Sequence, residues 1–152
     1  MSELPLIAVT DSATCPRPLA EQIKRLTKLT ELRPQAVILR AKSLDKAAYR
    51  KLALQAQQSC EATCIPLILH SDWQLASELG IQNLHLPLAL LRQLPACERT
   101  HFTWLSTSGH SVGEAQEETD TADGVNRQAY SAADSLQKAK SARCKAGLAL
   151  RS

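Results

Sequence analysis

Five short apolar segments of this sequence are each followed by polar residues that can bind a ligand or move a proton. These residues are Thr10-Asp11, Arg40-Ala41-Lys42, His70-Ser71-Asp72, His85 and Ser108-Gly109-His110. Arg40 and Lys42 can bind a phosphate, arginine through its planar fork and lysine as a point charge. The carboxylate of Asp72 suits Mg²⁺. His110, expected just before a helix, can serve as a general acid or base near neutral pH.

The same residue types also have purely structural roles. Ser43, Ser71 and Ser111 are typical helix N-caps. Arg40 and Lys42 can pair with the aspartates that follow neighbouring strands. A zinc site built from the histidines and Asp72 would have spacings that match no metal motif, so no metal site is predicted.

The apolar segments have the length and composition of buried parallel strands. They cover Leu6–Thr10, Ala36–Arg40, Ile65–His70, Asn83–Pro87 and Phe102–Ser108. Each is short and nearly continuous in hydrophobicity, which is typical of strands covered on both faces. In parallel α/β folds, ligands bind beyond the carboxyl ends of the strands. We therefore expect the polar residues to gather on one rim.

The intervening segments have helical patterns. One helix is expected over Leu19–Leu26, and a second follows an N-cap at Ser43 and continues through Ala56. A third is expected over Asp72–Leu79, ending at Gly80. The next connection, at Ala89–Leu94, is short, and a capping box at Ser111–Glu114 is expected to open a further helix. Alternating strands and helices predict an α/β class with a parallel sheet, either a barrel or an open doubly wound sheet.

From residue 117 the composition becomes polar, first acidic and then basic. We therefore expect a partial-barrel domain over residues 1–116 and a tail over 117–152 that is disordered or loosely helical. A typical (β/α)₈ barrel has about 250 residues, with a floor near 200. Five strand-and-helix units followed by this tail are expected to leave the barrel incomplete, with open sheet edges that favour self-association.

Composition narrows the class of protein. A net charge of +3 over 152 residues is mild and does not form the dense basic stripe of a nucleic-acid binder. No apolar run is long enough to cross a membrane, and the start lacks a secretory pattern, so a cytoplasmic protein is expected. The five cysteines are irregularly spaced, which indicates reduced thiols rather than a zinc site.

The five strand segments resemble those of the thiamine phosphate synthase/TenI superfamily over about residues 6–116. The resemblance lies in Leu6-Ile7-Ala8-Val9-Thr10-Asp11, in Leu39-Arg40-Ala41-Lys42 (Leu-Arg-x-Lys), in Ile65–Asp72, in Leu84-His85-Leu86, and in Ser108-Gly109-His110-Ser111-Val112-Gly113-Glu114-Ala115 (Ser-x-His-Ser-x-x-Glu-Ala). It implies an incomplete TIM (β/α)₈ barrel and thiamine chemistry. Synthases of the family join a pyrimidine diphosphate to a thiazole phosphate with the help of Mg²⁺. TenI-type members aromatise a thiazole phosphate carboxylate by proton transfer, which needs a histidine.

The departures from the family pattern favour the TenI branch. Arg40, Lys42 and Asp72 match, whereas Ser71 and Trp73 replace the residues on either side of the aspartate, and Pro87, Leu88 and Leu90 replace the Gly, Gln and second Asp of the fourth strand. The metal that neutralises a departing diphosphate is held by two carboxylates, Asp72 and the aspartate that Leu90 replaces. Leu90 cannot coordinate a metal ion. Mg²⁺, held by Asp72, is therefore expected only if synthase activity persists; otherwise no cofactor is expected.

The resemblance implies His110 as the catalytic residue, with Arg40, Lys42, Ser108 and Asp72 around a small thiazole phosphate ligand. Because the barrel is expected to be incomplete, we expect weak or absent catalysis. Two alternatives stay open: a non-catalytic anion-binding or regulatory protein, and a thiamine phosphate synthase-like transferase. No nucleic-acid or membrane partner is expected.

Overall fold

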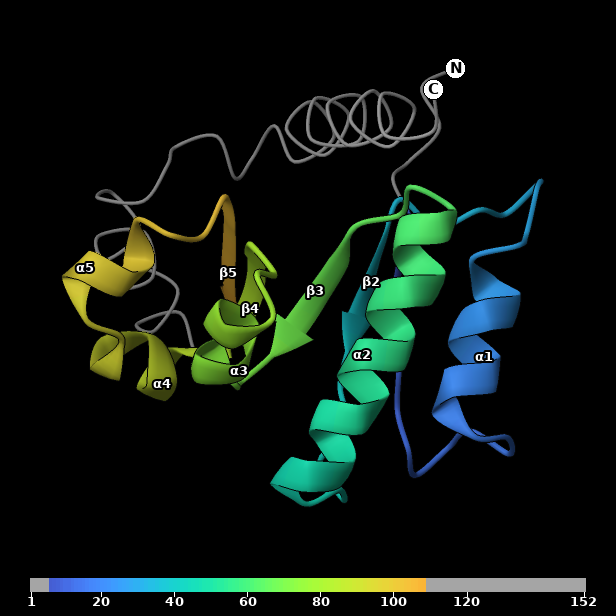
Figure 1. Ribbon diagram of the computed structural model, residues 1–152. Helices are drawn as coiled ribbons and strands as arrows, with labels where there is room; N and C mark the ends of the chain where they lie inside the picture. Colours follow the sequence, from blue (N-terminus) through green and yellow to red (C-terminus); the bar gives the residue numbers. More distant parts are fainter. Residues whose placement is uncertain (1–5, 109–152) are drawn as a thin grey trace. The chain divides into compact units, whose positions relative to one another are not determined.

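The computed structural model describes residues 6–108, in which strands and helices alternate (Figure 1). The elements in order are β1 (Ile7–Val9), α1 (Leu19–Leu26), β2 (Ala36–Leu39), α2 (Lys46–Ala62), β3 (Leu67–His70), α3 (Trp73–Glu78), β4 (Asn83–Pro87), α4 (Leu88–Gln93), α5 (Ala96–Arg99) and β5 (Trp104–Ser108). The strands form one sheet in the order β1-β2-β3-β4-β5. The β1–β2, β3–β4 and β4–β5 pairs are parallel.

This strand order decides between the two architectures left open by the sequence. An open doubly wound sheet reverses its strand order at a switch point, whereas a (β/α) barrel adds each new strand beside the previous one. The consecutive order therefore confirms the α/β class and the five strands of an incomplete barrel. All five strands lie within the predicted segments, and β4 has the predicted bounds.

Within the described residues the chain divides after Leu67 into two compact units, each considered by itself. In the first, β1 pairs with β2 in a register that sets Ile7 against Ala36 and Val9 against Ile38. Helices α1 and α2 lie side by side and pack against each other (Figure 1).

The core of the first unit follows from helical and strand periodicity. Helix α2 buries one stripe at helical spacing, made of Tyr49, Leu52, Ala53, Ala56 and Cys60. Helix α1 contributes Leu19 and Ile23. Strand β2 is buried at three of its four positions, Ala36, Val37 and Leu39. The buried side chains of these three elements form the core of the first unit.

The N-cap predicted for α2 is wrong. The cap is Asp45, whose Oδ1 accepts the backbone N–H of Ala48 at 2.8 Å. A cap must directly precede the first helical residue to reach an unpaired N–H group in the first turn, and Ser43 lies two residues too early. The Ser43 hydroxyl instead hydrogen-bonds the Ser12 hydroxyl at 2.7 Å.

In the second unit, which begins at Ile68, α3 lies within the predicted segment Asp72–Leu79 and ends before Gly80, as expected. Gly80 follows it at φ +67°, a left-handed conformation that glycine adopts without steric cost. The fourth connection, expected as one short segment, consists of α4 and α5 on either side of Pro95. Arg99 from α5 donates to the carbonyl oxygens of Leu91 and Leu94 at the end of α4, where carbonyl groups have no partner one full turn further along the helix. The Leu91 oxygen also accepts the backbone N–H of Leu94 at 3.2 Å.

The predicted capping box at Ser111–Glu114 and the tail over 117–152 lie outside the described residues. Among residues 6–108, no helix is long and apolar enough to cross a membrane.

Candidate functional site

In the first unit, Arg40 and Asp11 meet where β1 and β2 end. An Nη atom of Arg40 lies 3.7 Å from Oδ1 of Asp11, and both side chains are about one-third exposed. Asp11 also holds the following turn, because Oδ1 accepts the backbone N–H of Ala13 at 3.2 Å. The structure thus joins two of the polar residues that the sequence placed at neighbouring strand ends, and Arg40 remains accessible to an anion.

Thr10 fixes the backbone that carries this pair. Its hydroxyl accepts the backbone N–H of Arg40 at 2.9 Å and donates to the Arg40 carbonyl oxygen at 3.0 Å. The side chain is only 4% exposed. A buried hydroxyl with both partners at these distances restricts the backbone at Arg40. Lys42, two residues later, is exposed.

In the second unit, the carboxylate of Asp72 caps the N-terminus of α3. Its Oδ1 accepts the backbone N–H of Leu75 at 2.9 Å and so caps α3. Asp72, rather than the expected Ser71, is therefore the cap. Ser71 instead lies with its hydroxyl 2.7 Å from Nδ1 of His70.

The end of β4 offers no carboxylate. Helix α4 begins directly after Pro87, and its first residues are Leu88, Ala89 and Leu90. A magnesium site of the synthase type requires oxygen ligands here to complement Asp72. The described residues of this unit therefore do not fit such a metal site. Nowhere within residues 6–108 do three or more His, Cys, Asp or Glu side chains gather as metal ligands.

Ser108 ends β5 and is half-buried, paired in register with Pro87 of β4. This position is at the carboxyl end of the strand, where the sequence analysis expected a ligand-facing residue. His110, the predicted catalytic residue, lies outside the described residues.

Sequence reasoning missed a cluster formed by His70, His85 and Ser106. The register pairs His70 with His85 and His85 with Ser106 across three neighbouring strands. The two imidazole rings stack, with centroids 5.6 Å apart and 28° between their planes. The available signal was the position of both histidines at strand ends, but only the register shows that they touch.

The cluster is held together by polar contacts between its side chains. Nδ1 of His85 lies 2.8 Å from Oγ of Ser106, which also accepts the indole N–H of Trp104 at 3.2 Å. Burial lowers the pKa of His85 below its ordinary value of 6.5, because desolvation disfavours the charged form. The ring is therefore neutral at pH 7 and can accept a proton.

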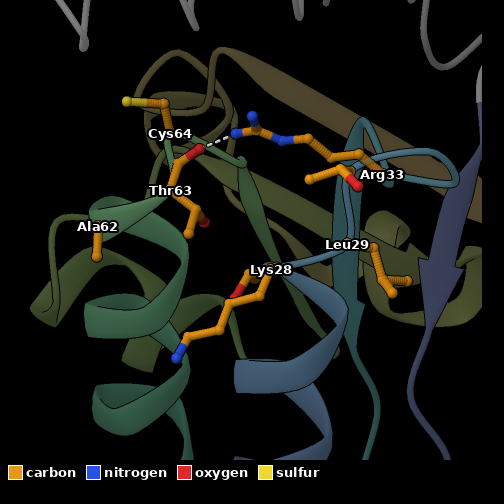
Figure 2. Close-up of a pocket in the computed structure, with 8 residues that line it drawn as sticks. Lys28, Leu29, Arg33, Ala62, Thr63 and Cys64 are labelled. Carbon is orange, nitrogen blue, oxygen red and sulfur yellow. Dashed lines mark hydrogen bonds between the residues drawn. The ribbon is translucent and has the colours of Figure 1, made fainter.

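The first unit also contains a hollow of about 550 Å³ where α1 and α2 end (Figure 2). It is lined by Thr27, Lys28, Leu29, Thr30, Arg33, Ala62, Thr63 and Cys64. The guanidinium of Arg33 donates to the carbonyl oxygen of Thr63, the C-cap of α2. A cation at this position complements the helix C-terminus. The hollow lies beyond the amino end of β2, whereas Arg40 follows the carboxyl end of that strand, so the hollow is not the predicted ligand site.

The buried thiol of the first unit is a poor nucleophile. Cys60 is buried in α2, and burial, reinforced by the charge of Glu61, raises its pKa from 9.0 to about 12. Cys15 and Cys97 also carry free thiols. Cys64 is disulfide-bonded, which corrects the expectation that all cysteines are reduced.

A comparison with models of protein families finds a match over most of the chain. The model of the family described as thiamine monophosphate synthase (TMP-TENI) matches residues 6–141. This range contains the five segments that carry the resemblance and continues beyond the last of them. A search of curated proteins finds no match to the chain.

Proposed function

Because the chain belongs to the thiamine monophosphate synthase family, we propose that it binds a thiazole phosphate and acts by TenI-type proton transfer on a thiazole phosphate carboxylate. In this proposal His110 is the acid/base residue. Arg40 and Lys42 bind the phosphate or carboxylate of the ligand, while Ser108 and Asp72 line its site.

The observation that carries the choice of branch is the end of β4, where Pro87 leads directly into the apolar first turn of α4. Loss of a diphosphate builds negative charge that a metal held by carboxylates must neutralise. Aromatisation of a thiazole carboxylate moves a proton and expels no diphosphate. An apolar β4 end is therefore compatible with proton transfer and unfavourable for the synthase reaction.

The environment of Arg40 supports the role proposed for it. The Arg40–Asp11 distance of 3.7 Å is longer than the 2.7–2.9 Å of a strong charge-assisted hydrogen bond. An incoming phosphate or carboxylate can form a bidentate pair with this guanidinium. The exposed Lys42 adds a second positive charge to the same loop.

The direct test is turnover of thiazole phosphate carboxylate by the full chain. We expect aromatisation faster than the uncatalysed conversion, and its loss in His110→Ala. His101→Gln is the matched control, because His101 is exposed and pairs with Glu98 at 3.2 Å. The measured rate also tests the expectation of weak catalysis. Turnover at the wild-type rate in His110→Ala contradicts the role of that histidine, and no turnover in wild type contradicts the proposed activity.

A second candidate is anion binding without catalysis, which Arg40 and Lys42 favour by their position after β2. Calorimetry with thiazole phosphate separates the two. Binding that weakens about tenfold or more in Arg40→Gln, together with no turnover in wild type, supports a binding protein. Absence of binding contradicts both candidates.

A further inference from the structure

The second unit places two imidazoles and a hydroxyl in one row across β3, β4 and β5. His70 is the last residue of β3 and is paired with His85, which in turn is paired with Ser106. Side chains of directly paired residues emerge on the same face of a sheet and touch. The ring stacking at 5.6 Å therefore follows from the register and does not depend on a flexible loop.

Each ring has a hydroxyl partner at the same nitrogen. The hydroxyl of Ser71 lies 2.7 Å from Nδ1 of His70, and that of Ser106 lies 2.8 Å from Nδ1 of His85. Because a serine oxygen has two acceptor lone pairs, Ser106 can accept the indole N–H of Trp104 and the imidazole N–H at Nδ1 together. In that arrangement Nε2 of His85 carries a lone pair, the form in which a histidine accepts a proton.

Ser71 adds an unusual backbone conformation beside the rings. Its φ is 70°, a left-handed value that is uncommon for a residue other than glycine. In this conformation its backbone N–H donates to the carbonyl oxygen of His85 at 2.9 Å, while its hydroxyl contacts His70. Strained backbone of this kind clusters at functional sites. Ser71 thus links the backbone of one histidine to the ring of the other.

The ring geometry argues against one metal ion shared by the two histidines. The lone pair of an imidazole nitrogen lies in the ring plane. With 28° between the planes and 5.6 Å between the centroids, the two lone pairs do not converge within the 2.0–2.1 Å expected for a zinc–nitrogen bond. Proton transfer needs no such convergence, because each ring exchanges its proton independently.

We propose that His85 is the general base of the reaction and that Ser106, His70 and Ser71 are positioning residues. The inference rests on the proposed function, since aromatisation breaks a C–H bond at one carbon and forms a C–H bond at another. Nε2 of His85 takes the first proton, and the electron pair of the broken bond enters the conjugated system of the ligand. A proton from water is added at the second carbon. His85 then releases its proton to water, so the step is a balanced isomerisation.

The kinetic test compares His85→Gln, Ser106→Ala and the control His101→Gln. We expect His85→Gln to lower kcat by about 100-fold or more, as for loss of a general base, with KM changed less than about threefold. Ser106→Ala is expected to lower kcat about tenfold and to move the acidic limb of the kcat/KM–pH profile, an effect that a merely structural residue would not produce. The control should equal wild type.

The outcomes separate this inference from the proposed function. Wild-type kcat in His85→Gln, with His110→Ala inactive, overturns the role of His85 and leaves the proposed function standing. No turnover in wild type overturns the proposed function and this role with it. If His85→Gln does not fold, nitrogen-detected NMR of wild type at pH 7.5 decides. We expect His85 protonated at Nδ1 and unprotonated at Nε2, and the reverse tautomer overturns the inference.

Discussion

Removing one hydroxyl at Thr10 should destabilise the first unit measurably. In Thr10→Val the side chain keeps its shape but loses both hydrogen bonds to the Arg40 backbone, at 2.9 and 3.0 Å. Each such bond contributes about 1 kcal/mol net, and a buried backbone group left without a partner costs about 1–3 kcal/mol. The added methyl group offsets about 0.8 kcal/mol. We expect a net loss of about 2 kcal/mol in the free energy of unfolding.

Urea unfolding followed by circular dichroism measures this loss. With an m-value of about 1–3 kcal/mol/M, the midpoint should fall by about 1 M at unchanged m. Thr10→Ser is the matched control, because it keeps the hydroxyl and removes one methyl group, at a cost of about 0.8 kcal/mol. A Val variant at least as stable as wild type would refute the reasoning, because the hydroxyl would then contribute no more than the added methyl group, about 0.8 kcal/mol.

Three further predictions concern single side chains. Cys60, with its pKa raised to about 12, should resist iodoacetamide at pH 8 in the folded protein while the exposed Cys97 reacts; equal labelling rates, read by mass spectrometry, would contradict its burial. The pKa of His85 in the folded protein lies below the unfolded value of 6.5. As the pH falls below 6.5, the unfolded state therefore binds more protons than the folded state, and the folded protein loses stability. Wild type should therefore lose more stability than His85→Gln between pH 7.5 and 5.5 in urea titrations, and parallel losses would argue against the shift. Asp72→Ala should cost about 1 kcal/mol through loss of the α3 cap, whereas Asp72→Asn should cost little because asparagine caps equally well; equal midpoints for the two variants would disprove the capping role.

The strands could be predicted from sequence because parallel strands buried on both faces leave compact apolar segments. Asn83–Pro87 illustrates this, since the predicted and observed bounds of β4 agree. Helix starts were less predictable. Ser43 and Asp45 are both good N-cap residues, and only the backbone path decides which one reaches the free N–H groups. The same ambiguity separated Ser71 from Asp72 at α3.

The candidate site was predictable only in part. The position of Arg40 and Asp11 at the ends of β1 and β2 indicated that they could meet, and the structure brings them to 3.7 Å. The stacking of His70 on His85 could not be predicted, because it depends on a register that a shift of one residue would destroy. Ser106 carried no signal at all, since a serine within a strand is unremarkable until its neighbour across the sheet is known.

The central claim, that proton transfer rather than diphosphate displacement is the chemistry of this chain, is tested most directly by offering both reactions to the same preparation. One reaction contains thiazole phosphate carboxylate with a metal chelator. The other contains a hydroxymethylpyrimidine diphosphate, thiazole phosphate and Mg²⁺. We predict aromatised thiazole in the first and no thiamine phosphate in the second. Mg²⁺-dependent formation of thiamine phosphate, without aromatisation in the presence of chelator, would contradict the account.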